Sequence, residues 1–293
     1  MVKGFVFGKF LPFHKGHEAM IQFASTHCDL LTVLPCCSDK ELVPAETRVN
    51  WIRDTFASNP KIEVKSFEYL ESDFPNTSVS SEDVSKIWSD IFRKIFPDYT
   101  VLVSSEPYGD YVASYMGIKH ILYDIDRMNI PISATAIRND INSNWSFLPN
   151  AVKKYYRQKV VLLGTESTGK STLTHKLADF FGCSFVNEIG REIISHSNSL
   201  NIDDLNRVVI EHAKCIDEAV NQGDPLIIID TNIFTTMSYA KLFLTEDLNI
   251  NLDTFRSHEA DLYLLMTNEV DFIQDGTRLS ESDRNRLDVS LRS

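Results

Sequence analysis

Short apolar runs, each ending near glycine, proline or small polar residues, recur along the chain, and stretches with helical spacing of apolar residues fill the intervals. Runs of this length are typical of strands buried in a sheet, and apolar residues three and four apart are typical of helices. The predicted strands cover residues 5–7, 30–36, 62–66, 101–104, 121–123, 159–163, 184–186, 225–230 and 260–265. Their alternation with helices predicts an α/β fold with two mostly parallel, Rossmann-like sheets.

The predicted helices lie between these strands. Residues 16–27 follow the first strand, another helix carries Arg48 and Trp51, and residues 203–220 form a long one. Ser80 and Asp83 resemble a capping box, after which apolar residues at helical spacing include Trp88. Arg48 reaches a phosphate or a base, or else is a solvated helix charge. Trp88 stacks on a substrate ring, or else belongs to the core.

A length of 293 residues suggests two domains of common size. The stretch 145–159 contains Pro149 and reads as a short helix or linker, so we expect domains at residues 1–157 and 158–293. The basic residues in this stretch, Lys153, Lys154 and Arg157, are most simply a solvated face.

The composition excludes several classes of protein. A formal charge of −12 argues against a broad nucleic-acid interface, which needs a basic face. No apolar run reaches the length of a membrane span, and we expect no membrane partner. Five cysteines without metal-ligand spacing, and an amino terminus that enters a strand almost at once, predict a cytoplasmic protein with reduced thiols. A homo-oligomer is an open alternative.

The stretch Val6 to His17, VFGKFLPFHKGH, predicts a phosphate site. Gly8 ends the apolar run, and His14, Gly16 and His17 stand at the start of a helix. Gly16 allows close approach of a ligand, and a helix start aims free N–H groups at an anion. The two imidazoles and the nearby Lys9 add donors and charge. A plain strand–turn–helix with two surface histidines is the alternative, which the strand, the glycine break and the proline turn disfavour.

The segment 132–138, ISATAIR, is a second phosphate signal. Ser133 is a candidate N-cap, Thr135 lies in the first turn, and Arg138 follows one turn later. Hydroxyls, free N–H groups and a guanidinium at a helix start suit the β- and γ-phosphates of ATP.

The second domain opens with G-x-x-x-x-G-K-S between a predicted strand and a helix, which is the context a P-loop requires. Backbone N–H groups of such a loop surround the β-phosphate, Lys170 reaches the β- and γ-phosphates, and Ser171 ligates Mg²⁺. The strand 225–230 ends in Asp230, which matches a Walker B acid that orients Mg²⁺. The expected nucleotide-binding residues are Gly164, Thr165, Glu166, Ser167, Thr168, Gly169, Lys170, Ser171 and Thr172.

These separated motifs together resemble the bifunctional NadR type, in which a nicotinamide-nucleotide adenylyltransferase is fused to a ribosylnicotinamide kinase. The resemblance runs from about Val2 to the last residue. It implies an H-x-G-H nucleotidyltransferase domain followed by a P-loop kinase domain, with ATP as a substrate of both and Mg²⁺ as cofactor. The implied small-molecule partners are nicotinamide mononucleotide, nicotinamide riboside, ATP and NAD.

For the first domain the resemblance implies adenylyl transfer to nicotinamide mononucleotide without a protein nucleophile. His14 and His17 contact the α-phosphate, Lys9 and Arg138 hold the leaving pyrophosphate, and Mg²⁺ bridges the phosphates. Trp88 is a candidate for the nicotinamide ring. The other implied nucleotide-binding residues are Gly8, Phe10, Gly16, Asp126, Arg127, Ser133 and Thr135.

For the second domain the resemblance implies that Glu188 and Arg191 face the ribosyl substrate, with a charged helix start as the alternative. Arg278, in a D-G-x-R segment, is a candidate for the transferred phosphate. Arg284 and Arg286 are weaker candidates, with a solvated helix face as their default.

Two departures from the family pattern put the kinase activity in doubt. Asn232 replaces the second acid of the family's I-D-T-D segment. The family's closing helix, strand and helix are also absent, so we expect an unprotected sheet edge, in a short chain or a fragment. An adenylyltransferase whose impaired kinase domain acts as a nucleotide sensor is therefore an alternative, and transfer to a pantetheine or flavin precursor is a rival. With no room before Val2 for the repressor module of some relatives, we expect no DNA binding.

Overall fold

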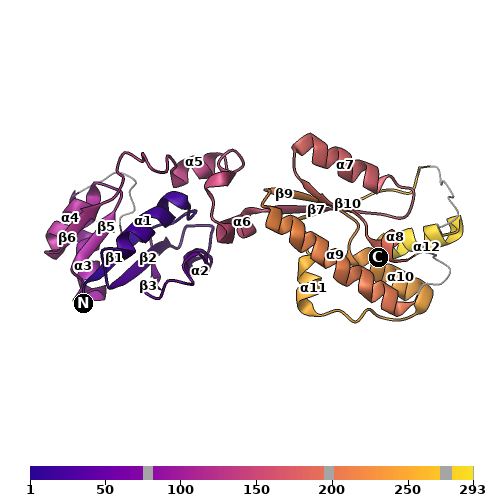
Figure 1. Cartoon of the computed structure of the whole chain (residues 1–293), viewed down its shortest axis with the longest axis horizontal. Helices are drawn as coiled ribbons and strands as arrows, with labels where there is room; N and C mark the ends of the chain where they lie inside the picture. The colour runs from indigo at the N-terminus through magenta and orange to yellow at the C-terminus, as the bar shows by residue number, and fades with distance from the viewer. Residues whose placement is uncertain (75–81, 195–200, 271–278, 293) are drawn as a thin grey trace. The chain divides into compact units, whose positions relative to one another are not determined.

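A computed structural model of the chain describes residues 1–74, 82–194, 201–270 and 279–292. The chain divides into two compact units, Met1–Tyr155 and Tyr156–Ser293, each with its own parallel sheet (Figure 1). The predicted α/β fold with two parallel sheets is confirmed. None of the helices in the described part of the chain is long and apolar enough to cross a bilayer.

The first unit contains a sheet whose strands run in the order β3-β2-β1-β5-β6, all parallel. Its order reverses at the central strand β1, and ligands of open α/β sheets bind at the carboxyl ends of the strands at such a point. Here that point lies beyond the ends of β1 and β5. The strands are β1 (Lys3–Gly8), β2 (Leu30–Ser38), β3 (Ile62–Val64), β5 (Val101–Ser104) and β6 (Lys119–Leu122), with β4 (Phe67–Tyr69) paired to the far end of β2.

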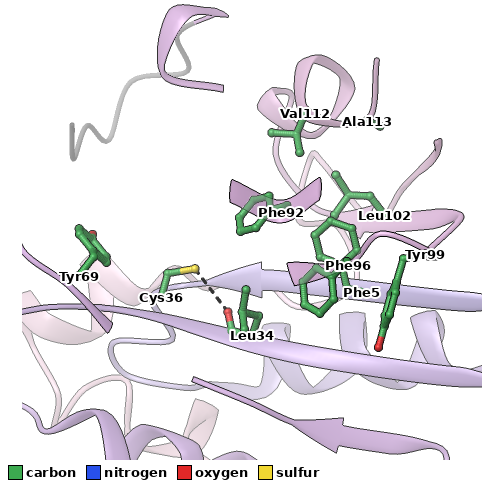
Figure 2. Packing of buried hydrophobic residues seen from close by; sticks show 10 residues of the cluster. All are labelled: Phe5, Leu34, Cys36, Tyr69, Phe92, Phe96, Tyr99, Leu102, Val112 and Ala113. Carbon is green, nitrogen blue, oxygen red and sulfur yellow. Dashed lines mark hydrogen bonds between the residues drawn. The ribbon is translucent and has the colours of Figure 1, made fainter. Parts of the chain in front are cut away.

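Aromatic packing fills one face of this sheet. Phe5 of β1 contacts Phe92 and Phe96 at ring-centroid distances of 5.5 and 4.7 Å, and Val112 belongs to the same cluster (Figure 2). Helices α3 and α4 therefore cover the face to which Phe5 points. The helices of the unit are α1 (Lys15–Ser25), α2 (Ala45–Thr55), α3 (Glu82–Ile95), α4 (Tyr108–Met116), α5 (Ala134–Asn139), the 3₁₀ turn η1 (Trp145–Phe147) and α6 (Asn150–Tyr156).

The second unit contains a four-stranded parallel sheet in the order β10-β7-β9-β8. Its strands are β7 (Gln158–Leu163), β8 (Ser184–Val186), β9 (Leu226–Asp230) and β10 (Leu262–Leu265). Its helices are α7 (Lys170–Phe181), α8 (Gly190–Ile193), α9 (Ile202–Gln222), α10 (Ile233–Tyr239), the π-helical turn η3 (Ala240–Leu244), α11 (Leu252–Ser257) and α12 (Glu281–Arg292).

Both faces of this second sheet are apolar, because a helix covers each of them (Figure 1). Ile227 and Ile229 cluster with Ile216 of α9, whereas Ile228, between them, clusters with Ala178 of α7. Alternate side chains of a strand point to opposite faces. The strand therefore reads as a continuous apolar run, as parallel strands covered on both faces do.

Some local predictions differ from the structure. Strands 101–104 and 184–186 are as predicted, but β4 was not predicted. Arg157 is not part of a solvated face, because its side chain is buried and its Nε donates to the Asp224 carbonyl at 2.7 Å. The predicted cap at Ser80 lies outside the described residues.

Candidate active sites

The turn after β1 packs two imidazoles against an aromatic wall. His14 caps α1, with its Nδ1 accepting from the backbone N–H of His17 at 3.3 Å, and the two rings stack at 3.7 Å between centroids. The ring of Phe10 contacts His17 at 5.0 Å. A Cβ at position 16 would lie 3.1 Å from the His14 ring, so the motif's glycine leaves room for the histidine pair.

A pocket beyond the sheet gathers residues that are far apart in the sequence. Its volume is about 210 Å³, below the roughly 300–1,000 Å³ of sites that enclose a whole small molecule, so it suits part of a nucleotide. The structure brings the two predicted phosphate signals, around His17 and Ser133, together at this one pocket. It is lined by His14, Gly16, His17, Ser105, Glu106, Tyr123, Asp124, Arg127, Ile130, Ile132, Ser133, Ala134 and Thr135.

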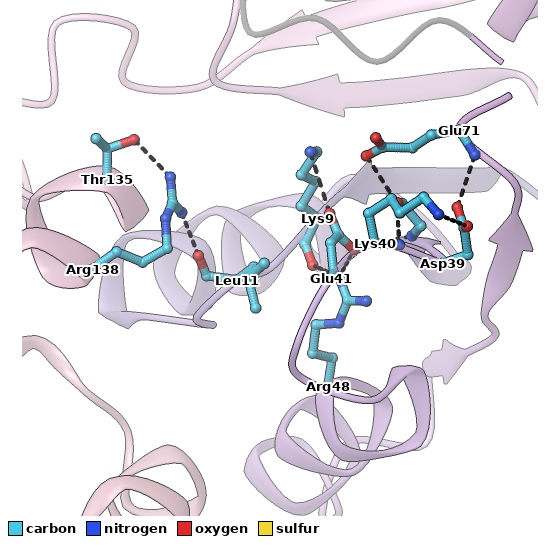
Figure 3. A network of polar contacts seen from close by, with 10 residues as sticks. Lys9, Leu11, Asp39, Lys40, Glu41, Arg48, Glu71, Thr135 and Arg138 are labelled. Atoms are coloured by element: carbon cyan, nitrogen blue, oxygen red, sulfur yellow. Dashed lines mark hydrogen bonds and ion pairs between the residues drawn. The ribbon is translucent and has the colours of Figure 1, made fainter.

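The start of α5 has the predicted geometry. Ser133 is the N-cap, and its hydroxyl accepts from the Ala136 N–H at 3.1 Å. Arg138 lies outside the lining residues but beside the pocket, since one of its Nη atoms donates to Thr135 Oγ1 at 3.1 Å and the other to the Leu11 carbonyl (Figure 3).

The charge in the pocket differs from the expectation. Burial lowers the pKa of His14 to about 4, and burial lowers the pKa of His17 well below its ordinary value, with Arg127 adding to both shifts. The imidazoles are therefore neutral at pH 7 in the free protein, so they bring a donor but no charge. The positive charge among the lining residues comes from Arg127.

Acid is expected to destabilise the first unit through these imidazoles. The pKa of His14 is about 4 in the folded protein and 6.5 ordinarily, so between these values the unfolded chain binds more protons. The free energy of unfolding therefore falls as the pH drops through this window, by about 2 kcal/mol from His14 at about pH 5. His14→Asn keeps a capping oxygen without a titrating ring, and should reduce the loss by that amount.

This loss is measurable by denaturant unfolding at several pH values. All three tryptophans, Trp51, Trp88 and Trp145, belong to the first unit, so their fluorescence reports on that unit. His27→Asn is the control, because His27 is exposed and lies two residues beyond the end of the same helix. Equal acid sensitivity in the His14 variant and the parent would contradict the prediction.

Lys9 contacts the buried side chains of Glu41 and Arg48 and does not line the pocket. Its Nζ lies 3.2 Å from Glu41, and Arg48 donates to Glu41 at 2.7 Å and to the Lys9 carbonyl at 3.1 Å (Figure 3). The side chain of Arg48 is 1% exposed, so the prediction of a solvated helix charge was wrong. Glu41 neutralises the buried guanidinium of Arg48. Through its bond to the Lys9 carbonyl, Arg48 fixes the turn that precedes the histidines.

Other predicted residues of the first domain have different roles or places. Asp126 is exposed and outside the lining, whereas Asp124 lines the pocket and accepts from the N–H groups of Met128 and Asn129. Sequence reasoning missed Asp124. Trp88 is half-buried against the aromatic cluster and packs on Tyr69 at 5.2 Å, so its candidacy for a ligand ring stays a prediction. A Cβ added at Gly8 would lie 3.7 Å from the Phe10 ring, so Gly8 packs beside the aromatic wall of which Phe10 is a part.

The P-loop of the second unit closes around a buried lysine. Gly164, Ser167 and Gly169 have φ values of +145°, +60° and +85°, which curl the loop between β7 and α7. Lys170 Nζ donates to the Thr165 carbonyl at 2.9 Å, and Thr168 Oγ1 donates to the same oxygen at 2.8 Å. The curled loop thereby positions the free N–H groups at the start of α7 beside the Lys170 ammonium group. Ser171 and Thr172 lie in the first turn of this helix.

Asp230 lies beside this loop at the end of β9. Asp230 pairs with Leu162 of β7 in the sheet register, and the Thr231 N–H donates to the Leu162 carbonyl at 3.0 Å. The carboxylate is 1% exposed, and its Oδ2 has no hydrogen-bond partner among the described residues. The described residues contain no group of three or more His, Cys, Asp or Glu that could hold a metal by itself.

The C-terminal helix anchors the P-loop. Arg284 of α12 donates to Thr165 Oγ1 at 3.4 Å and is 3% exposed, so its prediction as a solvated residue was wrong. Glu166 accepts from the Tyr239 hydroxyl at 3.1 Å and the Leu279 N–H at 2.9 Å. Arg286 is exposed and pairs with Asp283.

The predicted ribosyl-site residues are only partly described. Glu188 follows β8 directly, at the same end of the sheet as Asp230. Arg191 lies in α8, but its side chain is outside the described residues, as is the whole of Arg278.

Comparison with known proteins finds two matching families and relatives with the same order of domains. A cytidylyltransferase-like family matches residues 5–143, and an AAA domain matches residues 159–292. The chain is 29% identical over 304 residues to the trifunctional NAD biosynthesis/regulator protein NadR of Escherichia coli (strain K12), covering 97% of this chain and 73% of that protein.

Solved structures show the same fold. A NadR protein in complex with NAD and AMP-PNP has a TM-score of 0.66 at 22% identity, covering 99% of this chain and 86% of its own. A NadR protein in complex with NR has a TM-score of 0.67 at 23% identity, covering 99% of this chain and 85% of its own.

Proposed function

We propose that the chain is an NAD salvage enzyme of the NadR type with two active sites. The support is its similarity to NadR over 97% of its length and its matches to a cytidylyltransferase-like family and an AAA domain, in that order. The second domain phosphorylates nicotinamide riboside with ATP. The first domain transfers an adenylyl group from ATP to nicotinamide mononucleotide. Crystals of related NadR proteins that contain NAD and AMP-PNP, or NR, support this choice of ligands.

In the first domain, a phosphate oxygen of the mononucleotide attacks the α-phosphorus of ATP, and the bond to the β-phosphate oxygen breaks to release pyrophosphate. The neutral rings of His14 and His17 donate N–H bonds to the α-phosphate oxygens as their charge increases. Arg127 supplies the positive charge at the pocket. Ser133 and Thr135 fix the β- and γ-phosphates, and Arg138, beside the pocket, holds the leaving group.

In the second domain, the 5′-hydroxyl of the riboside attacks the γ-phosphorus of a second ATP. Lys170 and the N–H groups of the loop hold the β- and γ-phosphates and stabilise the charge of the transition state. The residues fit a magnesium ion, because Asp230 Oδ2 is buried without a partner among the described residues and Ser171 adds a hydroxyl. A bound Mg²⁺ would neutralise charge on the phosphates.

The observation that carries the proposal is the pocket that His17 and Ser133 share, although more than a hundred residues separate them. The test supplies ATP and Mg²⁺ with either nicotinamide riboside or its mononucleotide, and identifies the products by mass. We expect the mononucleotide from the first mixture, then NAD, and NAD with pyrophosphate from the second. NAD formation no faster than without protein, while phosphopantetheine or a flavin precursor is adenylylated, would refute it.

Asn232 favours a second candidate, in which the second domain binds ATP but transfers phosphate slowly. Its side chain is 1% exposed, and its Oδ1 accepts from the Phe234 N–H at 3.0 Å as the cap of α10. An amide at this position, unlike the acid of the family pattern, cannot accept a proton from the ribose hydroxyl. The domain would then sense nucleotide more than it turns it over.

Asn232→Asp is expected to raise the kcat of riboside phosphorylation about tenfold, because a carboxylate keeps the cap and adds a proton acceptor. The control is Asn251→Asp, which changes an asparagine that caps α11 in the same way, through the Thr254 N–H at 2.8 Å. An unchanged or lower rate in the Asn232 variant would remove this residue as the cause of slow transfer.

A further inference from the structure

Outside the proposed contacts of the first site, three side chains form a serine–histidine–aspartate series. Ser104 Oγ lies 3.0 Å from His120 Nε2, and His120 Nδ1 lies 2.7 Å from Asp110 Oδ1. Ser104 ends β5, His120 belongs to β6, and Asp110 to the first turn of α4. The side chain of His120 is 7% exposed, whereas that of Asp110 is 72% exposed.

This series holds a turn and does not provide a nucleophile. Ser104 Oγ lies 3.0 Å from the Glu106 carbonyl and accepts from the Glu106 N–H at 3.4 Å, so its one proton is directed either to that carbonyl or to His120 Nε2. Ser104 is 3% exposed, and a Cβ at Gly109 would lie 2.3 Å from Ser104 Oγ and 2.4 Å from His120 Nε2, so the serine is enclosed and not open to a substrate. The bonds instead fix the path of the chain from β5 into α4.

The turn presents Glu106 to the nucleotide pocket. Glu106 Oε1 accepts from Arg127 at 3.0 Å, and both residues line the pocket with the histidine pair. Arg127 is close enough to that pair for its charge to act on both rings. Glu106 and Arg127 are each roughly two-fifths exposed, so neither is held in place by burial. The orientation of Arg127 therefore depends on what fixes Glu106.

We infer that His120 is a positioning residue for the adenylyl-transfer site: through Ser104 it fixes the Glu106 turn, and through Glu106 it holds the Arg127 guanidinium toward the phosphates. The inference rests on the proposed function of the first domain. Asp110 orients the imidazole, and Gly109 leaves the space that the series occupies. Ser104, Asp110 and His120 are not among the residues that line the pocket.

A double-mutant cycle tests this dependence. His120→Ala is expected to lower kcat/KM for NAD formation from nicotinamide mononucleotide and ATP about tenfold, as the loss of a hydrogen bond that orients a charged group would. In an Arg127→Ala background the same change should cost less than about twofold, because the residue through which His120 acts is gone. Equal losses in the two backgrounds, or no loss in the parent, would overturn the inference.

Three further measurements keep the outcome clear. Asp110→Ala in the same cycle replaces an exposed residue, so it remains informative where His120→Ala does not fold. The control is His27→Ala, an exposed histidine whose Nδ1 lies 2.9 Å from the Phe23 carbonyl, and it should leave kcat/KM unchanged. The Kd for NAD, measured by titration calorimetry across the same cycle, separates the two proposals. A parent that makes no NAD refutes the proposed function. The coupling between His120 and Arg127 is then read from NAD binding, where additive losses in affinity would overturn the inference.

Discussion

Replacing Lys170 by alanine is expected to lower kcat/KM for riboside phosphorylation by about a thousandfold. The ammonium group lies inside the P-loop, 2.9 Å from the Thr165 carbonyl, where a γ-phosphate can take the place of that carbonyl as its acceptor. The Lys170 side chain is buried, so its charge acts in a medium of low dielectric constant, and a water molecule that fills the space in the variant cannot substitute for that charge. The rate is measured with ATP, Mg²⁺ and nicotinamide riboside, following nicotinamide mononucleotide by mass.

The control for this variant is Lys176→Ala, because Lys176 is an exposed lysine on the same helix α7. It should keep the full rate. NAD formation from supplied mononucleotide should also persist in the Lys170 variant, since the two sites lie in different units. Phosphorylation retained within about tenfold of the parent would remove the P-loop from the proposed mechanism.

Replacing His17 by alanine is expected to lower kcat/KM for NAD formation by about a hundredfold to a thousandfold, the usual effect of losing one donor that stabilises a developing oxyanion. The ring is packed between His14 at 3.7 Å and Phe10 at 5.0 Å, so no neighbouring donor can move into its place without repacking. The rate is measured by a coupled assay for NAD with supplied mononucleotide.

Riboside phosphorylation should remain at the level of the parent in this variant, which shows that the second unit is folded and that the sites are separate. His27→Ala, just beyond the carboxyl end of α1, is the matched histidine control. Loss of both activities in His17→Ala would contradict the assignment of adenylyl transfer to the first unit alone.

The sequence could predict those parts of the sites that depend on local chain geometry. Glycine spacing and flanking apolar runs are enough to place the loop before Lys170 and the helix start at His14, because both follow from backbone conformation within a few residues. Ser133 could be predicted as a cap for the same reason, and its hydroxyl does bond the Ala136 N–H.

The remaining features depend on partners that are distant in the sequence. Arg48, Arg157 and Arg284 are buried, although a solvated position was predicted for Arg157 and Arg284 and was one of two alternatives for Arg48. Their acceptors are Glu41 and the Lys9 carbonyl, the Asp224 carbonyl, and Thr165, and only the fold brings these together. A charged side chain reads as solvated from its own segment alone, since burial requires a partner.

Asp124 illustrates a different reason for a missed residue. The family pattern drew attention to Asp126, two residues later, but Asp124 has a φ of +44° and accepts two backbone N–H groups in its turn. Such a turn selects the residue that can fold back on its own backbone, which is an aspartate or asparagine. Its signal in the sequence is only the D-x-D spacing, which does not distinguish the two acids.

The strands of the second sheet, apolar toward α7 and α9 alike, have a consequence for folding. Sliding β9 by one residue along β7 would exchange Ile228 for Ile229, so the burial of apolar area barely discriminates between the two alignments. The polar terminus of the strand does discriminate, because a slipped alignment draws the Asp230 carboxylate into the hydrocarbon interior. Asp230, the acid proposed to orient magnesium, thus also selects the correct alignment of β9 with β7. Its replacement by an apolar residue should leave refolding molecules divided between misaligned and native sheets.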